Sequence, residues 1–96
     1  MNAPLAQPLA PLTTLDGIAP GERVLVRAVT GPTPIRRRLM EMGLCSGVVV
    51  DVLRRAPFGD PLEVRLRGYL LSLRAMQAAL IRVERLATGQ SAPNVA

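Results

Sequence analysis

The sequence of 96 residues contains no histidine, no lysine and no tryptophan, and it has only one cysteine, one tyrosine and one phenylalanine. A single cysteine excludes a disulfide within the chain, and without histidine no nitrogen–sulfur metal site can form in one chain. The usual base of a Ser–His or Cys–His pair is also missing. Carboxylates at a catalytic spacing and a phosphate-binding glycine loop are not apparent either. We therefore expect no enzyme, no cofactor and no resident metal.

Long apolar runs are missing as well. No stretch reaches the roughly 20 residues that a membrane helix needs. The first residues, Met1–Leu12, are apolar but contain three prolines and no basic start, so they do not resemble a signal peptide. We therefore expect a soluble, cytoplasmic protein without membrane insertion. Cys45 is either a reactive thiol or a small, partly buried apolar residue, and the second interpretation is favoured.

Basic charge comes entirely from arginine. Twelve arginines face seven acidic residues, which gives a formal net charge of +5. This balance favours acidic partners, whether nucleic acid, anionic lipid or an acidic protein surface, and does not choose among them. Hydrophobic residues make up 49% of the chain, enough for one packed, mainly aliphatic core.

The apolar pattern predicts one domain at residues 15–86, between a flexible leader (1–14) and a disordered tail (87–96). Alternation at 23–29 is typical of a strand. Thr33 is a plausible N-cap. Ile35, Leu39 and Met42 follow at helical spacing and are expected on the inward face, with Arg36, Arg37 and Glu41 outward, and Gly43 can end the helix. Further strands are predicted at 48–54, 62–66, 69–73 and 81–83, with a helical turn at 74–79 before the last one.

These elements predict a mainly β fold. Five short strands around one core close most economically as a small SH3-like barrel, because closure removes exposed strand edges. The barrel would carry one short α-helix and one helical turn before the last strand. On the return strand of the hairpin, Tyr69, Leu71 and Leu73 are expected on the buried face, with Tyr69 in the core or at its rim.

The order and spacing of several segments resemble the ferrous iron transport protein A (FeoA) family over residues 15–83. The matching segments are Arg38-Leu39, Met42-Gly43-Leu44, Gly47, the stretch from Ala56 to Leu62, Gly68-Tyr69, Leu73-Arg74, and Ile81 with Val83. The family fold is SH3-like. The resemblance implies a cytoplasmic accessory protein of bacterial ferrous iron uptake that contacts the membrane permease carrying a GTP-binding domain. It implies no catalytic residue.

Four side chains are candidates for partner binding. Arg36 and Arg37 could grip an acidic surface, since arginine makes bidentate contacts with carboxylates, or they could simply be the solvated face of the helix. Arg38 is expected to be structural. Phe58 and an outward-facing Leu70 nearby would form an apolar docking patch.

Two further interpretations stay open. A small basic barrel can bind nucleic acid, although two aromatic residues make a poor stacking platform and acidic residues interrupt the arginines. Self-association is also possible and is compatible with the accessory role.

Overall fold

The computed structural model describes residues 11–86 of the chain. The elements in chain order are β1 (Leu12–Thr14), η2 (Leu15–Gly17), β2 (Arg23–Val29), α1 (Thr33–Glu41), β3 (Val49–Arg55), β4 (Leu62–Leu66), β5 (Tyr69–Leu73), α2 (Ala75–Ala78) and β6 (Ile81–Arg85). The tail predicted at 87–96 and most of the predicted leader lie outside the described residues. Among the described residues, no helix is long and apolar enough to cross a membrane.

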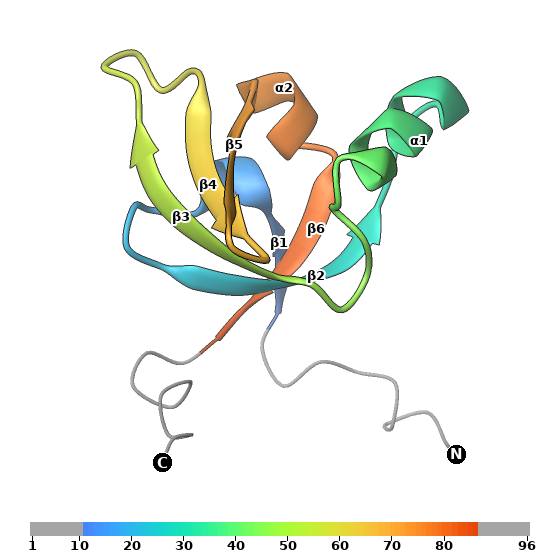
Figure 1. The fold of residues 1–96 in the computed structure, drawn as a ribbon, viewed down its shortest axis with the longest axis horizontal. Coiled ribbons are helices and arrows are strands. Elements are labelled where there is room, and N and C mark those ends of the chain that lie inside the picture. The colour runs from blue at the N-terminus through green and yellow to red at the C-terminus, as the bar shows by residue number, and fades with distance from the viewer. Residues whose placement is uncertain (1–10, 87–96) are drawn as a thin grey trace.

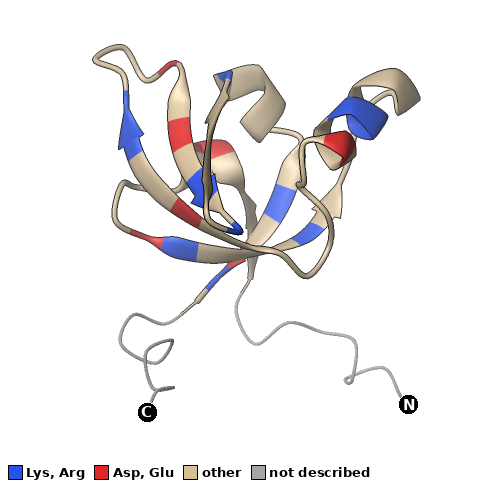
Figure 2. Ribbon diagram, in the orientation of Figure 1, with Lys and Arg blue, Asp and Glu red and all other residues tan. Residues whose placement is uncertain are grey.

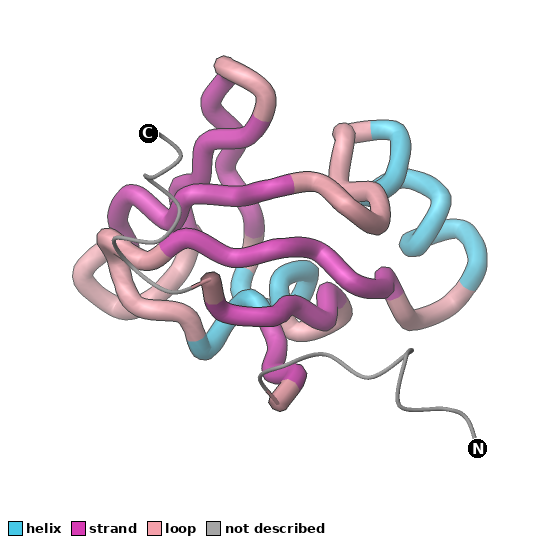
Figure 3. The backbone as a smooth tube through the Cα atoms, turned by 90° about the horizontal axis from the view of Figure 1, so that it is seen from below, coloured by secondary structure: helices cyan, strands magenta, loops and turns pink. Residues whose placement is uncertain are grey.

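All strands pair antiparallel in one sheet, in the order β1-β6-β2-β3-β4-β5. The sheet curls around the core, and β1 and β5 are its two edges (Figure 1). The short helical segments η2 and α2 lie against each other. Helix α1 projects from one end of the molecule, as the view from below also shows (Figure 3).

The predicted class, mainly β with one short helix and a helical turn before the last strand, is confirmed. The predicted count of five strands is wrong, because residues 12–14 form β1 instead of belonging to the leader. Thr13 and Thr14 pair with Val83 and Arg82 of β6. A segment of three residues is too short to show strand alternation in the sequence. Pairing with β6 makes it a strand, and a single-strand pattern does not reveal that pairing.

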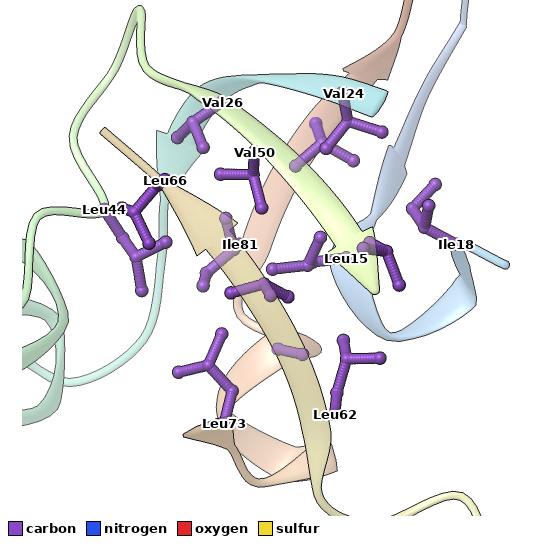
Figure 4. Packing of buried hydrophobic residues seen from close by; sticks show 14 of the residues in the cluster. Leu15, Ile18, Val24, Val26, Leu44, Val50, Leu62, Leu66, Leu73 and Ile81 are labelled. Carbon is purple, nitrogen blue, oxygen red and sulfur yellow. The ribbon is translucent and has the colours of Figure 1, made fainter. Parts of the chain in front are cut away.

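The core is aliphatic, as predicted. Side chains from the strands, η2, α1 and α2 point toward one another inside the curled sheet (Figure 4). No polar or charged residue is buried among the described residues. The buried residues are Leu15, Ile18, Val24, Val26, Leu39, Leu44, Val48, Val50, Val52, Leu62, Val64, Leu66, Leu73, Ala78, Ile81 and Val83.

Strand β5 departs from the expected burial. Leu73 is buried and Leu71 is half-buried, but Tyr69 is 43% exposed and lies at the rim. Its hydroxyl donates a hydrogen bond to the carbonyl of Met42, which draws the ring over the end of α1 instead of into the core. Outward-facing Leu70 is exposed, as predicted.

Candidate interaction surface

Helix α1 begins at Thr33, and Pro34 occupies its first turn, where the missing N–H costs nothing. The N-cap is Pro32 and not Thr33, so that detail of the prediction is wrong. The hydroxyl of Thr33 instead accepts a hydrogen bond from Nη2 of Arg36 at 3.3 Å. After the helix, Gly43 adopts a φ of +104°, the left-handed conformation predicted for its end.

The three arginines of α1 have different surroundings. Arg36 is half-buried, because its Nη1 donates to the carbonyl of Gly31 at 2.9 Å. Arg37 is exposed and lies beside a shallow hollow that Met40 and Glu41 also line. Arg38 is exposed and faces α2. Of the two arginines predicted to bind a partner, Arg37 is therefore the freer one.

A groove of about 430 Å³ lies between α1 and α2. Its walls are mostly apolar. Ile35, predicted to face the core, is 41% exposed, and Met76 on the opposite wall is 76% exposed. Such side chains lose water-accessible apolar surface when a partner covers them, which makes the groove a suitable docking site. The lining residues are Pro34, Ile35, Arg38, Met76, Gln77 and Leu80.

The connections before α1 and after α2 hold the groove in shape. The backbone N–H and the hydroxyl of Thr30 both donate to the carbonyl of Leu80, at 2.8 and 2.9 Å. Gly31 adopts a φ of +103°, and a Cβ there would lie 3.0 Å from Cδ1 of Leu80. Only glycine combines this conformation with so close an approach. The two helices are thereby tied together at the base of the groove.

Several arginines on the sheet form ion pairs with acidic neighbours, and acidic and basic positions are interspersed along the strands (Figure 2). Cross-strand ion pairs join Arg23 to Asp51 at 2.6 Å and Arg27 to Glu84 at 3.1 Å. The hydrogen bond from Arg23 to Asp51 raises the pKa of that guanidinium further. The remaining ion pairs of the described residues are Arg54–Glu63, Arg74–Asp60 and Arg85–Glu22. The three arginines of α1 have no such pairs in this part of the chain, and neither do Arg55, Arg65, Arg67 and Arg82. Helix α1 is therefore one of the places where positive charge is uncompensated.

Phe58 and Leu70 are both strongly exposed, at 97% and 60%. The structure does not bring them into one patch, so the nearby placement expected for them is wrong. Phe58 lies in the β3–β4 loop, which Asp60 ties to the start of α2 by accepting from the N–H of Ala75 at 2.9 Å. Leu70 pairs with Arg65 next to the Arg67-Gly68 turn, at the end of the β4–β5 hairpin away from the β3–β4 loop.

Cys45 is half-buried and packs against the core, and its Sγ lies 3.6 Å from the carbonyl of Met40. This placement agrees with the favoured structural interpretation. Within residues 11–86, no three His, Cys, Asp or Glu side chains form a group that could hold a metal ion.

Sequence reasoning did not find the α2 wall of the groove. No motif in the sequence around this wall indicates a site. Only the fold places its residues, Met76, Gln77 and Leu80, opposite α1. One available signal was Met76, a large apolar residue at the outward position of a very short helix.

Known proteins with similar sequence or structure were found by comparison. The chain is 36% identical over 70 residues, 73% of its length, to an Fe(2+) transport protein A/Fe(2+) transporter FeoB fusion protein of Porphyromonas gingivalis. It spans only 8% of that fusion protein.

Two solved structures are also similar. A FeoA-like protein from Clostridium acetobutylicum is 37% identical with a TM-score of 0.75, covering 79% of this chain and 88% of that one. A zinc complex of Stenotrophomonas maltophilia FeoA, described as a prokaryotic SH3 domain protein, is 28% identical with a TM-score of 0.66, covering 75% and 89%. The SH3-like prediction is thereby confirmed.

The FeoA domain family model matches residues 13–85, nearly all of the described residues. FeoA is a family of accessory or regulatory SH3-like domains and not a known enzyme family. The chain belongs to the FeoA domain family.

Proposed function

We propose that this chain is a cytoplasmic accessory protein of ferrous iron uptake that binds the GTP-binding permease by protein–protein contact. The observation that carries the proposal is the Porphyromonas gingivalis fusion protein, in which an Fe(2+) transport protein A and an Fe(2+) transporter FeoB form one chain. Two proteins that occur joined in one organism are good candidates for association where they are separate.

Contact is proposed through α1 and the groove beside it. The apolar walls around Ile35 and Met76 would receive apolar side chains of the permease's cytoplasmic domain. Arg38, which lines the groove, and Arg37, which is exposed elsewhere on α1, would meet acidic side chains. Such contacts orient the partner and speed its approach. An apolar centre with a charged rim is the usual anatomy of a specific interface.

The alternative of nucleic-acid binding receives less support. A basic stripe that follows a phosphate backbone needs several uncompensated cations in a row. On this sheet the cations alternate with acidic partners, as in Arg54 with Glu63 at 2.7 Å. A gel shift with generic RNA and DNA at two salt concentrations tests this point, and tight binding that weakens steeply with salt would favour the alternative.

The permease's purified cytoplasmic domain tests the proposal directly, by calorimetric titration with and without guanine nucleotide. We expect Met76→Glu to weaken binding because it buries a charge in the groove, and Arg36→Glu with Arg37→Glu to weaken it by reversing the charge of α1. Arg82→Glu on β6 is the control, since Arg82 is exposed and lines a different hollow, beside Leu12, Thr13 and Thr14, and not the groove.

Two results would contradict the proposal. One is the absence of association between the unmodified proteins in either nucleotide state. The other is an equal loss of binding in the Arg82→Glu control, which would show that the loss depends on net charge alone and not on α1.

A further inference from the structure

Strand β5 is an edge of the sheet, bonded only to β4. The two strands are joined by Arg67 and Gly68, whose φ angles are +50° and +84°. Positive φ at both central residues is typical of a type I′ turn, in which the flanking residues form a hydrogen-bonded pair. That pair is Leu66 and Tyr69.

Hydrogen-bonded and non-bonded pairs alternate along an antiparallel ladder. Leu70 and Ser72 therefore belong to the non-bonded pairs, and their backbone N–H and C=O groups point away from β4. Neither residue makes another backbone hydrogen bond with the described part of the chain. The outer edge of β5 thus offers two donors and two acceptors at the spacing of a strand.

Nothing in β5 protects this edge against pairing. Edge strands commonly carry charges, prolines or bulges that prevent a further strand from adding. The sequence Tyr-Leu-Leu-Ser-Leu contains none of these residues, and its register with β4 is unbroken. Leu70, at 60% exposure, presents an apolar side chain beside the free backbone groups.

Arginines frame this uncharged strand. Arg67 lies in the turn before β5, and Arg74 directly follows the strand. Arg65, on the neighbouring strand β4, pairs with Leu70, so the two side chains share one face of the sheet. Arg65 and Arg67 are exposed and form no ion pair among the described residues. Arg74 reaches Asp60 only at 3.9 Å, and exposed pairs of this kind contribute little. Arginines at both ends of β5 would attract acidic side chains at both ends of an added strand.

The geometry points to a second protein-binding site at the β5 edge, one that takes an extended peptide segment with an apolar middle and acidic flanks. The segment would add to the sheet as a new strand, with backbone hydrogen bonds supplying affinity and the arginines selecting the flanks. This site is separate from the groove between α1 and α2 and does not depend on the identity of the permease.

A second copy of this chain fits the edge less well. Two β5 strands paired antiparallel about Leu71 would set Arg74 of one copy opposite Gly68 of the other, beside a second Arg67. Like charges facing each other across strands are destabilising. Charge complementarity therefore favours an acidic segment.

The test uses the whole chain and two synthetic capped hexapeptides, Glu-Val-Thr-Val-Thr-Glu and its neutral counterpart Gln-Val-Thr-Val-Thr-Gln. Amide resonances and hydrogen exchange are followed by NMR during titration. We expect the acidic peptide to bind more tightly, about tenfold, and to slow exchange of the Leu70 and Ser72 amides while leaving β2 and β3 unchanged. Replacing the second valine of the acidic peptide, its fourth residue, with proline should abolish that protection.

Variants of the protein give a second readout. Arg67→Glu and Arg74→Glu should each weaken binding of the acidic peptide severalfold and reduce the difference in affinity between the acidic and the neutral peptide. Arg82→Glu should change neither. Unaltered exchange at Leu70 and Ser72 would overturn the proposal, as would equal binding of both peptides. Protection of these amides that rises with protein concentration in the absence of peptide would also overturn it, since a second copy would then be the occupant.

Discussion

The hydroxyl of Tyr69 in β5 donates a hydrogen bond to the backbone carbonyl of Met42, at the C-terminal end of α1. The same oxygen lies so close to Gly43 that a Cβ there would overlap it. Gly43 also has a φ of +104°. One contact thus joins the helix that carries the candidate interaction surface to the edge strand of the sheet, and it explains why glycine and tyrosine occur at these two positions.

Gly43→Ala should lower the free energy of unfolding by about 2–3 kcal/mol, because the left-handed backbone and the displaced tyrosine both contribute. Gly47→Ala is the matched control. Gly47 has a φ of +94° but no atom within 4 Å of the added Cβ, so only the backbone cost of about 1 kcal/mol remains. Urea denaturation measures both variants, and equal losses would contradict the tyrosine contact.

Tyr69→Phe should cost about 0.5–1 kcal/mol, the net value of one partly exposed hydrogen bond. The ring stays, so only the bond to the Met42 carbonyl is lost. In the Gly43→Ala background the same change should cost less, because the two residues are coupled. A double-mutant cycle by chemical denaturation measures the coupling, and strictly additive losses would show that the contact has no energetic role.

Arg55 should matter for stability where its neighbour Arg54 does not. Nη2 of Arg55 donates to the carbonyls of Asp16 and Ile18, at 2.9 and 2.6 Å, and so fixes η2 against β3. Arg55→Met removes charged hydrogen bonds and should cost about 1.5–3 kcal/mol. Arg54→Met loses only an exposed pair with Glu63 and should change stability by about 0.5 kcal/mol or less. Thermal unfolding of the two variants would refute this role if they proved equally stable.

The acid dependence of stability should include a contribution from Glu22. Its pKa is lowered from the ordinary value of 4.5, first by the hydrogen bond from the Ala19 N–H and then by Arg85. A carboxyl whose pKa is lowered on folding stabilises the protein above its unfolded pKa, and this stabilisation is lost as the pH falls through the folded value. Glu22→Gln should therefore lose less stability than the unmodified chain between about pH 5 and pH 3. Identical pH profiles from urea titrations would contradict the assignment.

The sequence predicted the strands best where alternation is strong, as at Leu62–Leu66, whose inward residues are all buried. It failed at β1, because three residues carry no usable period and depend on their ladder to β6. Ile35 was predicted inward from helical spacing. It lies instead on the groove wall, because α1 projects from the barrel and covers the core only through Leu39.

Prediction of the candidate site was less complete. The outward positions of Arg37 and Leu70 followed from the pattern, but their distances from Phe58 did not. The groove requires α1 and α2 to meet through Thr30 and Leu80, which are 50 residues apart. Local periodicity contains no information on such a contact. The family resemblance, by contrast, predicted the SH3-like fold and the family correctly.

The central claim is that a partner docks in the groove between α1 and α2, and methyl NMR tests it most directly. The chain is labelled at its isoleucine, leucine and methionine methyl groups and titrated with the permease's cytoplasmic domain. The account predicts shifts or broadening first at Ile35, Met76 and Leu80, with Leu25 on the sheet unaffected. Changes confined to the sheet, with the groove methyl groups unaltered at saturation, would contradict it.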